Sequence, residues 1–122
     1  MDNQAKKVLI CDDSPTIVEA AYDELDARGY DVAVAYNGAE ALEILESETP
    51  DIIILDMEMP KMRGDEAAEK IRAIPRLSKI PIIALTAISP KTLGEKAKLF
   101  DAYLAAVHKS PGAAAFKHKF VP

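Results

Sequence analysis

Short apolar runs alternate with longer segments of mixed polarity along this chain. Four runs are rich in aliphatic residues and end at polar, glycine or proline positions: 8–11, 32–36, 51–56 and 80–86. Short runs of this kind are typical of strands that are buried on both faces of a parallel sheet. Because segments with helical periodicity lie between the runs, we predict an α/β fold in which helices cover both faces of the sheet.

The segments between the apolar runs carry helix signals at their ends. Ser14 and Pro15 supply an N-cap hydroxyl and a proline at the first helical position, and Gly29 ends that helix. The segment 37–40 resembles a capping box and opens a second helix. We expect Asp65 to cap a third helix in the same way.

The last third of the chain predicts one more helix and one more strand. Pro90 opens the helix. The apolar positions that recur on it at helical spacing are Leu93, Ala97, Phe100 and Leu104. A short fifth strand is predicted at 105–109, and 112–122 supply an irregular tail or a short last helix. We therefore expect a single domain over 1–122 with its core at 6–111.

Acidic residues follow two of the predicted strands. Asp12 and Asp13 come directly after 8–11, and Asp56 ends 51–56. In open α/β sheets, ligands bind outside the carboxyl ends of the strands where the strand order reverses, so we expect these acids to converge in one crevice. Three nearby carboxylates repel one another unless protons or a cation compensate them. A divalent metal site is the natural solution, although Asp12 and Asp13 could instead cap the helix that follows.

Charge and composition narrow the range of partners. The formal net charge is -5, and lysine and arginine do not cluster apart from 117–119, which argues against nucleic acid as a direct ligand. Cys11 is the single cysteine, so an intramolecular disulfide and a thiolate zinc site are excluded, and its apolar run predicts a buried core residue. With no basic-then-apolar leader and no apolar stretch of ~18 residues, we expect no membrane span and a cytoplasmic location.

Taken together, the motifs resemble the receiver domain of two-component response regulators over residues 6–111. The segments that carry the resemblance are Asp12-Asp13, Asp56-Met57-Glu58-Met59-Pro60 followed by Gly64, Leu85-Thr86-Ala87, and Lys109. The intervals from Asp13 to Asp56 and from Asp56 to Thr86 also suit this family. The resemblance implies a flavodoxin-like, doubly wound sheet of five parallel strands in the order 2-1-3-4-5, which in this chain would have a shortened or irregular C-terminal helix.

The resemblance also implies roles for the site residues. Asp56 is expected to be the nucleophile that takes a phosphoryl group and forms an acyl phosphate. Mg²⁺ is the implied cofactor because it prefers oxygen ligands. The ligands that the family pattern implies are Asp13, Asp56 and the backbone carbonyl of Glu58, with Asp12 binding either directly or through water. Thr86 would donate its hydroxyl to one phosphoryl oxygen, and Lys109 would pair with another.

The last motif departs from the family pattern. Family members usually carry an aromatic switch residue three positions before the lysine and a proline directly after it, whereas Lys109 is followed by Ser110 and preceded at that distance by Ala106. We favour the alignment that keeps Lys109 as the lysine and leaves Tyr103 in the fourth helix. The alternative alignment makes Tyr103 the switch residue and puts Ala106 at the lysine position.

The C-terminal helix is the second departure. The family normally closes with a long amphipathic helix on the face of the sheet that the first helix also covers, whereas 112–122 supply at most about three turns. Part of that face is therefore expected to be exposed, and an exposed apolar patch usually marks a partner site. A homodimer or a docked partner helix is the hypothesis there, and a chain that is a piece of a longer protein is an equally simple explanation.

The predicted function is a phosphorylation-controlled switch and not an enzyme in the ordinary sense. A histidine kinase or a histidine phosphotransfer protein would donate the phosphoryl group to Asp56 with Mg²⁺ present, and the altered conformation would change binding to a downstream protein. The alternative is a pseudo-receiver, an interaction module that signals without phosphate. A phosphatase with an aspartate nucleophile is disfavoured, because Glu58 stands where such enzymes carry a second aspartate.

Overall fold

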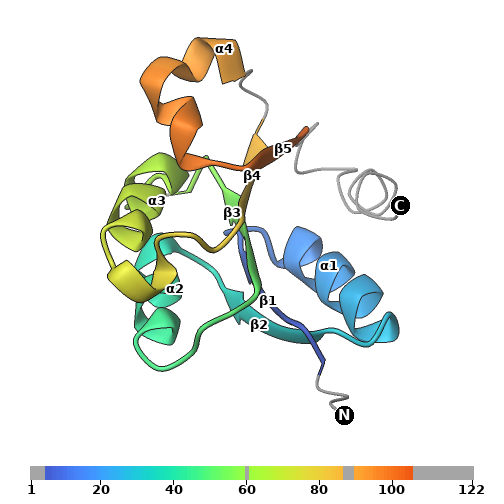
Figure 1. The fold of residues 1–122 in the computed structure, drawn as a ribbon. Coiled ribbons are helices and arrows are strands. Elements are labelled where there is room, and N and C mark those ends of the chain that lie inside the picture. Colours follow the sequence, from blue (N-terminus) through green and yellow to red (C-terminus); the bar gives the residue numbers. More distant parts are fainter. Residues whose placement is uncertain (1–4, 60, 87–89, 106–122) are drawn as a thin grey trace.

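The structure is a computed structural model, and it describes residues 5–59, 61–86 and 90–105. Its strands form one sheet, and helices lie on both sides of that sheet (Figure 1). The elements, in chain order, are β1 (Lys7–Cys11), α1 (Pro15–Ala27), β2 (Asp31–Ala35), α2 (Gly38–Leu45), β3 (Ile52–Asp56), α3 (Gly64–Arg72), the 3₁₀ turn η1 (Pro75–Leu77), β4 (Ile82–Thr86), α4 (Pro90–Leu93), the 3₁₀ segment η2 (Gly94–Leu99) and β5 (Ala102–Ala105). The alternation that the apolar runs predicted is confirmed.

The strands pair in parallel in the order β2-β1-β3-β4-β5. This order confirms the predicted doubly wound topology, in which the chain runs first to one side of β1 and then to the other. Cys11 lies opposite Leu55, and Asp56 lies opposite Leu85, so the carboxyl ends of β1, β3 and β4 are level. The acids that follow β1 and end β3 therefore emerge at the same edge of the sheet.

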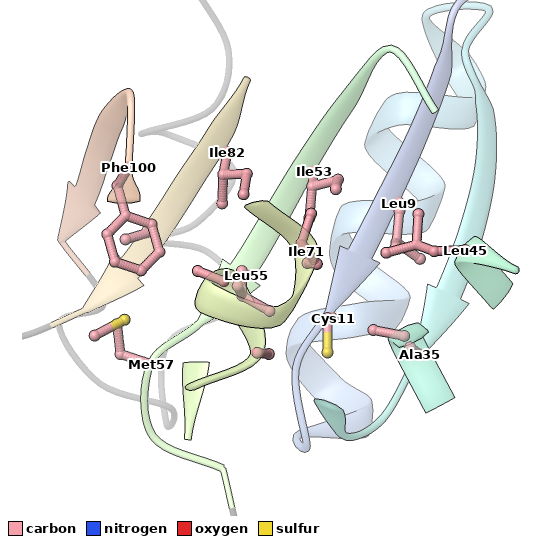
Figure 2. Close-up of a cluster of buried hydrophobic side chains, with 14 of the residues drawn as sticks. Leu9, Cys11, Ala35, Leu45, Ile53, Leu55, Met57, Ile71, Ile82 and Phe100 are labelled. Atoms are coloured by element: carbon pink, nitrogen blue, oxygen red, sulfur yellow. The ribbon is translucent and has the colours of Figure 1, made fainter. Parts of the chain in front are cut away.

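Helices α2 and α3 cover one face of the sheet, and α1 covers the other (Figure 1). Figure 2 shows the larger core, in which Leu9, Ile53 and Ile82 of three strands lie beneath Leu45 of α2 and Ile71 of α3. All five of these side chains are fully buried. Each buried leucine or isoleucine contributes about 1.5–3 kcal/mol to folding, so this cluster fixes the sheet against its helices. The smaller cluster joins α1 to the opposite side of the same strands.

The predicted caps of the first two helices are confirmed. Ser14 Oγ accepts a hydrogen bond from the N–H of Ile17 at 3.4 Å. Asn37 Oδ1 accepts from the N–H of Glu40 at 2.9 Å, and Glu40 Oε1 accepts in turn from the N–H of Tyr36 at 2.8 Å. This reciprocal pair is a close variant of the capping box, and it starts α2 directly after the end of β2.

The predicted cap of the third helix was wrong. α3 begins at Gly64, Arg63 occupies the N-cap position, and no side chain caps the helix there. Asp65 lies inside the first turn, where its carboxylate accepts hydrogen bonds from the side chains of Arg63 and Lys96. The acid still favours the helix, because a negative charge in the first turn interacts well with the helix dipole.

The fourth helix is shorter than predicted, and the fifth strand begins earlier. α4 has four residues and is followed by Gly94, whose left-handed φ of 62° ends the α-helix, after which the chain continues as the 3₁₀ segment η2. Phe100 is extended, with φ -115° and ψ 147°, and leads into β5. Tyr103 therefore lies in β5, opposite Ala84, and its predicted place in a helix was wrong.

One arginine side chain joins α3 to the segment between η1 and β4 and to the segment that leads into β5. The Arg72 guanidinium donates hydrogen bonds of 2.7–3.1 Å to backbone carbonyls and to one carboxylate. The residues whose oxygens it reaches are Ser78, Ile80, Leu99 and Asp101. Asp101 also accepts from the N–H of Ile82 at 2.9 Å, so it links Arg72 to the start of β4. A lysine could not reproduce this planar set of donors.

In the part of the chain that the structure describes, no helix is both long and apolar enough to cross a membrane. The tail 112–122, with its predicted short last helix, lies outside the described residues. The single domain over 1–122 and the exposed face beside α1 accordingly stay predictions.

Candidate functional site

Asp12, the first of the two acids after β1, is held in place by hydrogen bonds with the backbone. The N–H of Asp12 donates to the carbonyl oxygen of Ala35 at 3.1 Å, which extends the pairing of β1 with β2. Asp12 Oδ1 accepts from the N–H of Ser14 at 2.9 Å, and only 2% of Asp12 is exposed. Since Ser14 is the N-cap of α1, a capping role does not account for the two acids.

Asp56 ends β3 and is 1% exposed. The N–H of the next residue, Met57, donates to the carbonyl oxygen of Leu85 at 3.0 Å, so the backbone remains paired with β4 just past the strand. The N–H of Glu58 donates to Asp56 Oδ1 at 3.0 Å. This bond fixes the rotation of the carboxylate at the sheet edge.

Gly64 packs directly on the backbone that carries Asp56. A Cβ at this position would lie 2.3 Å from the carbonyl oxygen of Asp56 and 2.7 Å from Met57 Cα. The N–H of Gly64 also donates to the carbonyl oxygen of Met57 at 3.1 Å. Only glycine fits here, so the first turn of α3 rests against the acidic strand end. From the sequence alone Gly64 counts only as part of a motif, although a glycine between a strand and a helix often marks close backbone approach.

The three acids meet at this edge of the sheet. Asp12, Asp13 and Asp56 each offer a carboxylate oxygen, and these oxygens lie within 4.8 Å of one another. The register of β1 and β3 brings them together, as expected from the positions of the acids at strand ends. Carboxylates this close repel, and a cation relieves the repulsion. A set of oxygen donors, two of them from almost fully buried residues, fits a hard divalent cation such as Mg²⁺.

The remaining predicted site residues divide into described and undescribed positions. Thr86 ends β4, one residue beyond the Leu85 that pairs with Asp56, and is 5% exposed. The backbone of Glu58 lies next to the Asp56 carboxylate, while the Glu58 side chain is exposed. Lys109 lies outside the described residues, and its pairing with a phosphoryl oxygen stays a prediction.

Tyr103 has a different setting from the one predicted. Its hydroxyl donates to the carbonyl oxygen of Ala97 in η2 at 2.5 Å. Burial, and after it the charge of Asp101, raises the pKa of the Tyr103 phenol. Its place in β5, beside the strand that ends at Thr86, favours the alignment in which Tyr103 is the switch residue. That alignment puts Ala106, outside the described residues, at the lysine position.

Cys11 ends β1 just beneath the acids, and the predicted burial is confirmed. Its Sγ lies 3.4 Å from the carbonyl oxygen of Asn37 and 3.5 Å from Met59 Sδ. Burial raises the pKa of the Cys11 thiol to about 12, and the charges of Asp56 and Asp12 add to this effect. The thiol therefore acts as a neutral core group at neutral pH.

We expect Cys11 to react very slowly with alkylating reagents in the folded protein. The thiolate is the reactive form, and raising the pKa from 9.0 to about 12 lowers its population at pH 8 about a thousandfold. Iodoacetamide should label the chain fully in denaturant, and in native buffer only as fast as the chain opens. Rapid, complete labelling of the native protein at pH 8 would contradict this.

Comparison with known proteins gives a consistent result. Residues 8–110 match the family model of the response regulator receiver domain. A probable transcriptional regulator, ycf27 of Porphyra purpurea, is 40% identical over 88 residues, which cover 72% of this chain and 35% of the relative. The chain thus spans about a third of the length of the curated relatives that it matches.

Solved structures agree over almost the whole chain. The chemotaxis response regulator CheY4 of Vibrio cholerae is 28% identical with a TM-score of 0.80, and the match covers 97% of this chain and 100% of that chain. The response regulator TrrA of Thermotoga maritima, solved in complex with Mg²⁺ and BeF, is 37% identical with a TM-score of 0.74. That match covers 93% of this chain and 95% of the other.

Proposed function

Because the chain belongs to the response regulator receiver domain family, we propose that it is a switch controlled by phosphorylation of Asp56. Receiver domains interact with histidine kinases or histidine phosphotransfer proteins, and a phosphohistidine on such a partner is the proposed donor. The observation that carries the proposal is the convergence of Asp12, Asp13 and Asp56 at the carboxyl edge of the sheet.

In the proposed transfer, a carboxylate oxygen of Asp56 forms a bond to phosphorus while the bond from phosphorus to the histidine nitrogen breaks. The electron pair of the broken bond returns to the imidazole of the partner. The N–H of Glu58 holds the Asp56 carboxylate in one rotation, so little reorientation precedes the transfer. Mg²⁺ held by Asp12, Asp13, Asp56 and the Glu58 backbone carbonyl would offset the negative charge on the transferred oxygens.

The acyl phosphate then changes the contacts at the sheet edge. Thr86 donates its hydroxyl to one phosphoryl oxygen. Lys109 pairs with another in the alignment that keeps it as the family lysine, whereas the alignment favoured by the place of Tyr103 puts Ala106 at that position. The added group carries about two negative charges, and the new contacts favour a conformation that is minor beforehand. The output is altered binding to a downstream protein, which includes self-association as a homodimer.

The switch resets by hydrolysis. Water attacks the phosphorus, Asp56 leaves as a carboxylate, and inorganic phosphate is released. The chain is therefore proposed to catalyse only its own modification and reset, with no separate substrate. Its proposed location is the cytoplasm.

Incubation of the purified chain with acetyl phosphate and Mg²⁺ tests this function. We expect a mass increase of one phosphoryl group, mapped by peptide analysis to Asp56, and no increase when EDTA removes the metal. The alternative function, a pseudo-receiver, predicts a folded chain that gains no adduct from acetyl phosphate or from a phosphorylated histidine phosphotransfer protein.

A further inference from the structure

Helix α3 is tied to η2 by side chains at both of its ends. At the C-terminal end, Arg72 donates to the carbonyl oxygen of Leu99 and to the carboxylate of Asp101. At the N-terminal end, Lys96 Nζ donates to Asp65 Oδ2 at 2.8 Å. Because η2 leads into β5, these two ties hold the segment before β5 against α3.

The Asp65–Lys96 pair is asymmetric in its burial. The Asp65 side chain is 4% exposed, whereas the Lys96 side chain is 51% exposed. Arg63 Nε donates to the other Asp65 oxygen, Oδ1, at 3.1 Å. Burial alone would raise the pKa of Asp65, but the hydrogen bond and charge of Lys96, with the charge of Arg63, hold that pKa below its usual value. Loss of Lys96 would therefore remove part of the compensation of this buried carboxylate and leave the part that Arg63 supplies.

The same turn of α3 contacts the backbone of Asp56. Gly64, directly before Asp65, leaves no room for a Cβ against the Asp56 carbonyl oxygen, and its N–H donates to the carbonyl oxygen of Met57. The contact lies between backbone groups, so rotation of a side chain cannot absorb a shift there. A displacement of Asp65 therefore moves Gly64 against the segment that carries Asp56.

We propose that the Asp65–Lys96 ion pair couples η2 to the backbone of residues 56–58, which positions the Asp56 carboxylate and which we call the Asp56 turn. Asp65 is then a positioning residue that acts through Gly64. Coupling between two sites is reciprocal, so a change at Asp56 alters η2, and a change in η2 alters the Asp56 turn. The inference rests on the proposed function only in taking the change at Asp56 to be phosphorylation.

Amide hydrogen exchange of the full chain, resolved by NMR, tests the coupling without any phosphodonor. We expect Lys96→Met to speed exchange at the N–H groups of Glu58 and Gly64 by at least about fivefold, because both groups bond within the Asp56 turn. Lys96→Arg, which keeps the charge, should stay close to the parent. Exchange at Ile54, in the centre of β3, should not change, which separates coupling from a general loss of stability.

Lys98→Met is the matched control. Lys98 lies on the same segment, and its ion pair with Glu95 is exposed on both sides, at 77% and 88%. This variant removes the same charge from η2 but should leave the Asp56 turn unchanged. Equal exchange rates at Glu58 and Gly64 in Lys96→Met and Lys98→Met would overturn the proposal.

A second measurement adds acetyl phosphate and Mg²⁺. Exchange across η2 should then change in the parent and in Lys98→Met, and should change much less in Lys96→Met. A response of η2 in phosphorylated Lys96→Met that equals the parent's would also overturn the coupling. If no variant gains a phosphoryl adduct, the proposed function fails, while the exchange rates measured without donor still decide the coupling.

Discussion

Replacing Asp56 with asparagine is expected to abolish phosphoryl transfer to the chain. The amide nitrogen and oxygen of asparagine are poor nucleophiles, so no acyl phosphate forms. The fold should survive, because the asparagine Oδ1 can still accept the hydrogen bond that the Glu58 N–H gives to Asp56. Intact-mass spectrometry after incubation with acetyl phosphate and Mg²⁺ measures the loss, and circular dichroism checks the fold.

Asp51→Asn is the matched control for this variant. Asp51 lies just before the other end of β3, is exposed, and accepts the N–H of Lys7 at 2.7 Å, which an asparagine oxygen can also do. This control should take up the phosphoryl group like the parent. An adduct that persists in Asp56→Asn would place the acceptor elsewhere and refute the assignment of Asp56.

Among substitutions near the site that add one carbon atom, Gly64→Ala should lower the free energy of unfolding the most. The new Cβ would lie 2.3 Å from the carbonyl oxygen of Asp56, and a clash between backbone-fixed atoms cannot be relieved by rotating a side chain. We expect the free energy of unfolding to fall by about 3 kcal/mol. Mg²⁺ affinity should fall at least about tenfold, because the strand end that carries Asp56 must shift. Urea unfolding and magnesium titration measure the two effects.

A second glycine provides the control for Gly64. Gly29 has a φ of 92° and nothing within 4 Å of a Cβ built on it. Gly29→Asn should cost less than about 1 kcal/mol, since asparagine tolerates the left-handed conformation at a helix C-terminus. If Gly64→Ala unfolds at the parent's urea concentration and binds Mg²⁺ normally, the close approach does not constrain the site.

The acidic site could be predicted because it depends on local patterns. The aliphatic runs before Asp12 and within 52–55 lack helical periodicity, so they indicate strands, and the carboxyl ends of parallel strands share one sheet edge. The caps at Ser14 and Asn37 are equally local, and both formed as expected. The contact at Gly64 is local in sequence as well, but its closeness depends on how α3 packs.

The region after β4 could not be predicted in the same way. Leu93, Ala97 and Phe100 keep helical spacing across Gly94, so the pattern predicts a continuous helix. The left-handed conformation of Gly94, which ends the α-helix, cannot be inferred from that spacing. β5 has four residues, two of them alanine, so its strand preference is weak and tertiary pairing with β4 decides its position.

The environment of Asp65 shows a second limit. An acid beside a glycine at the start of a helical pattern is typical of a cap, and that interpretation was wrong. One of the cations that bind Asp65, Lys96, lies 31 residues further along the chain, and no local pattern connects it to the acid. Pairs of this kind emerge only once η2 is packed against α3.

The contacts of Arg72, the last residue of α3, affect how far the length of the segment that leads into β5 can vary. Since the guanidinium of Arg72 binds oxygens of residues before β4 and of residues at the entry to β5, the anchoring of β5 does not depend on how many residues lie between β4 and η2. Insertions or deletions there would change the length of this connection at modest entropic cost while β5 keeps its register. This part of the chain is thus free to diversify in length.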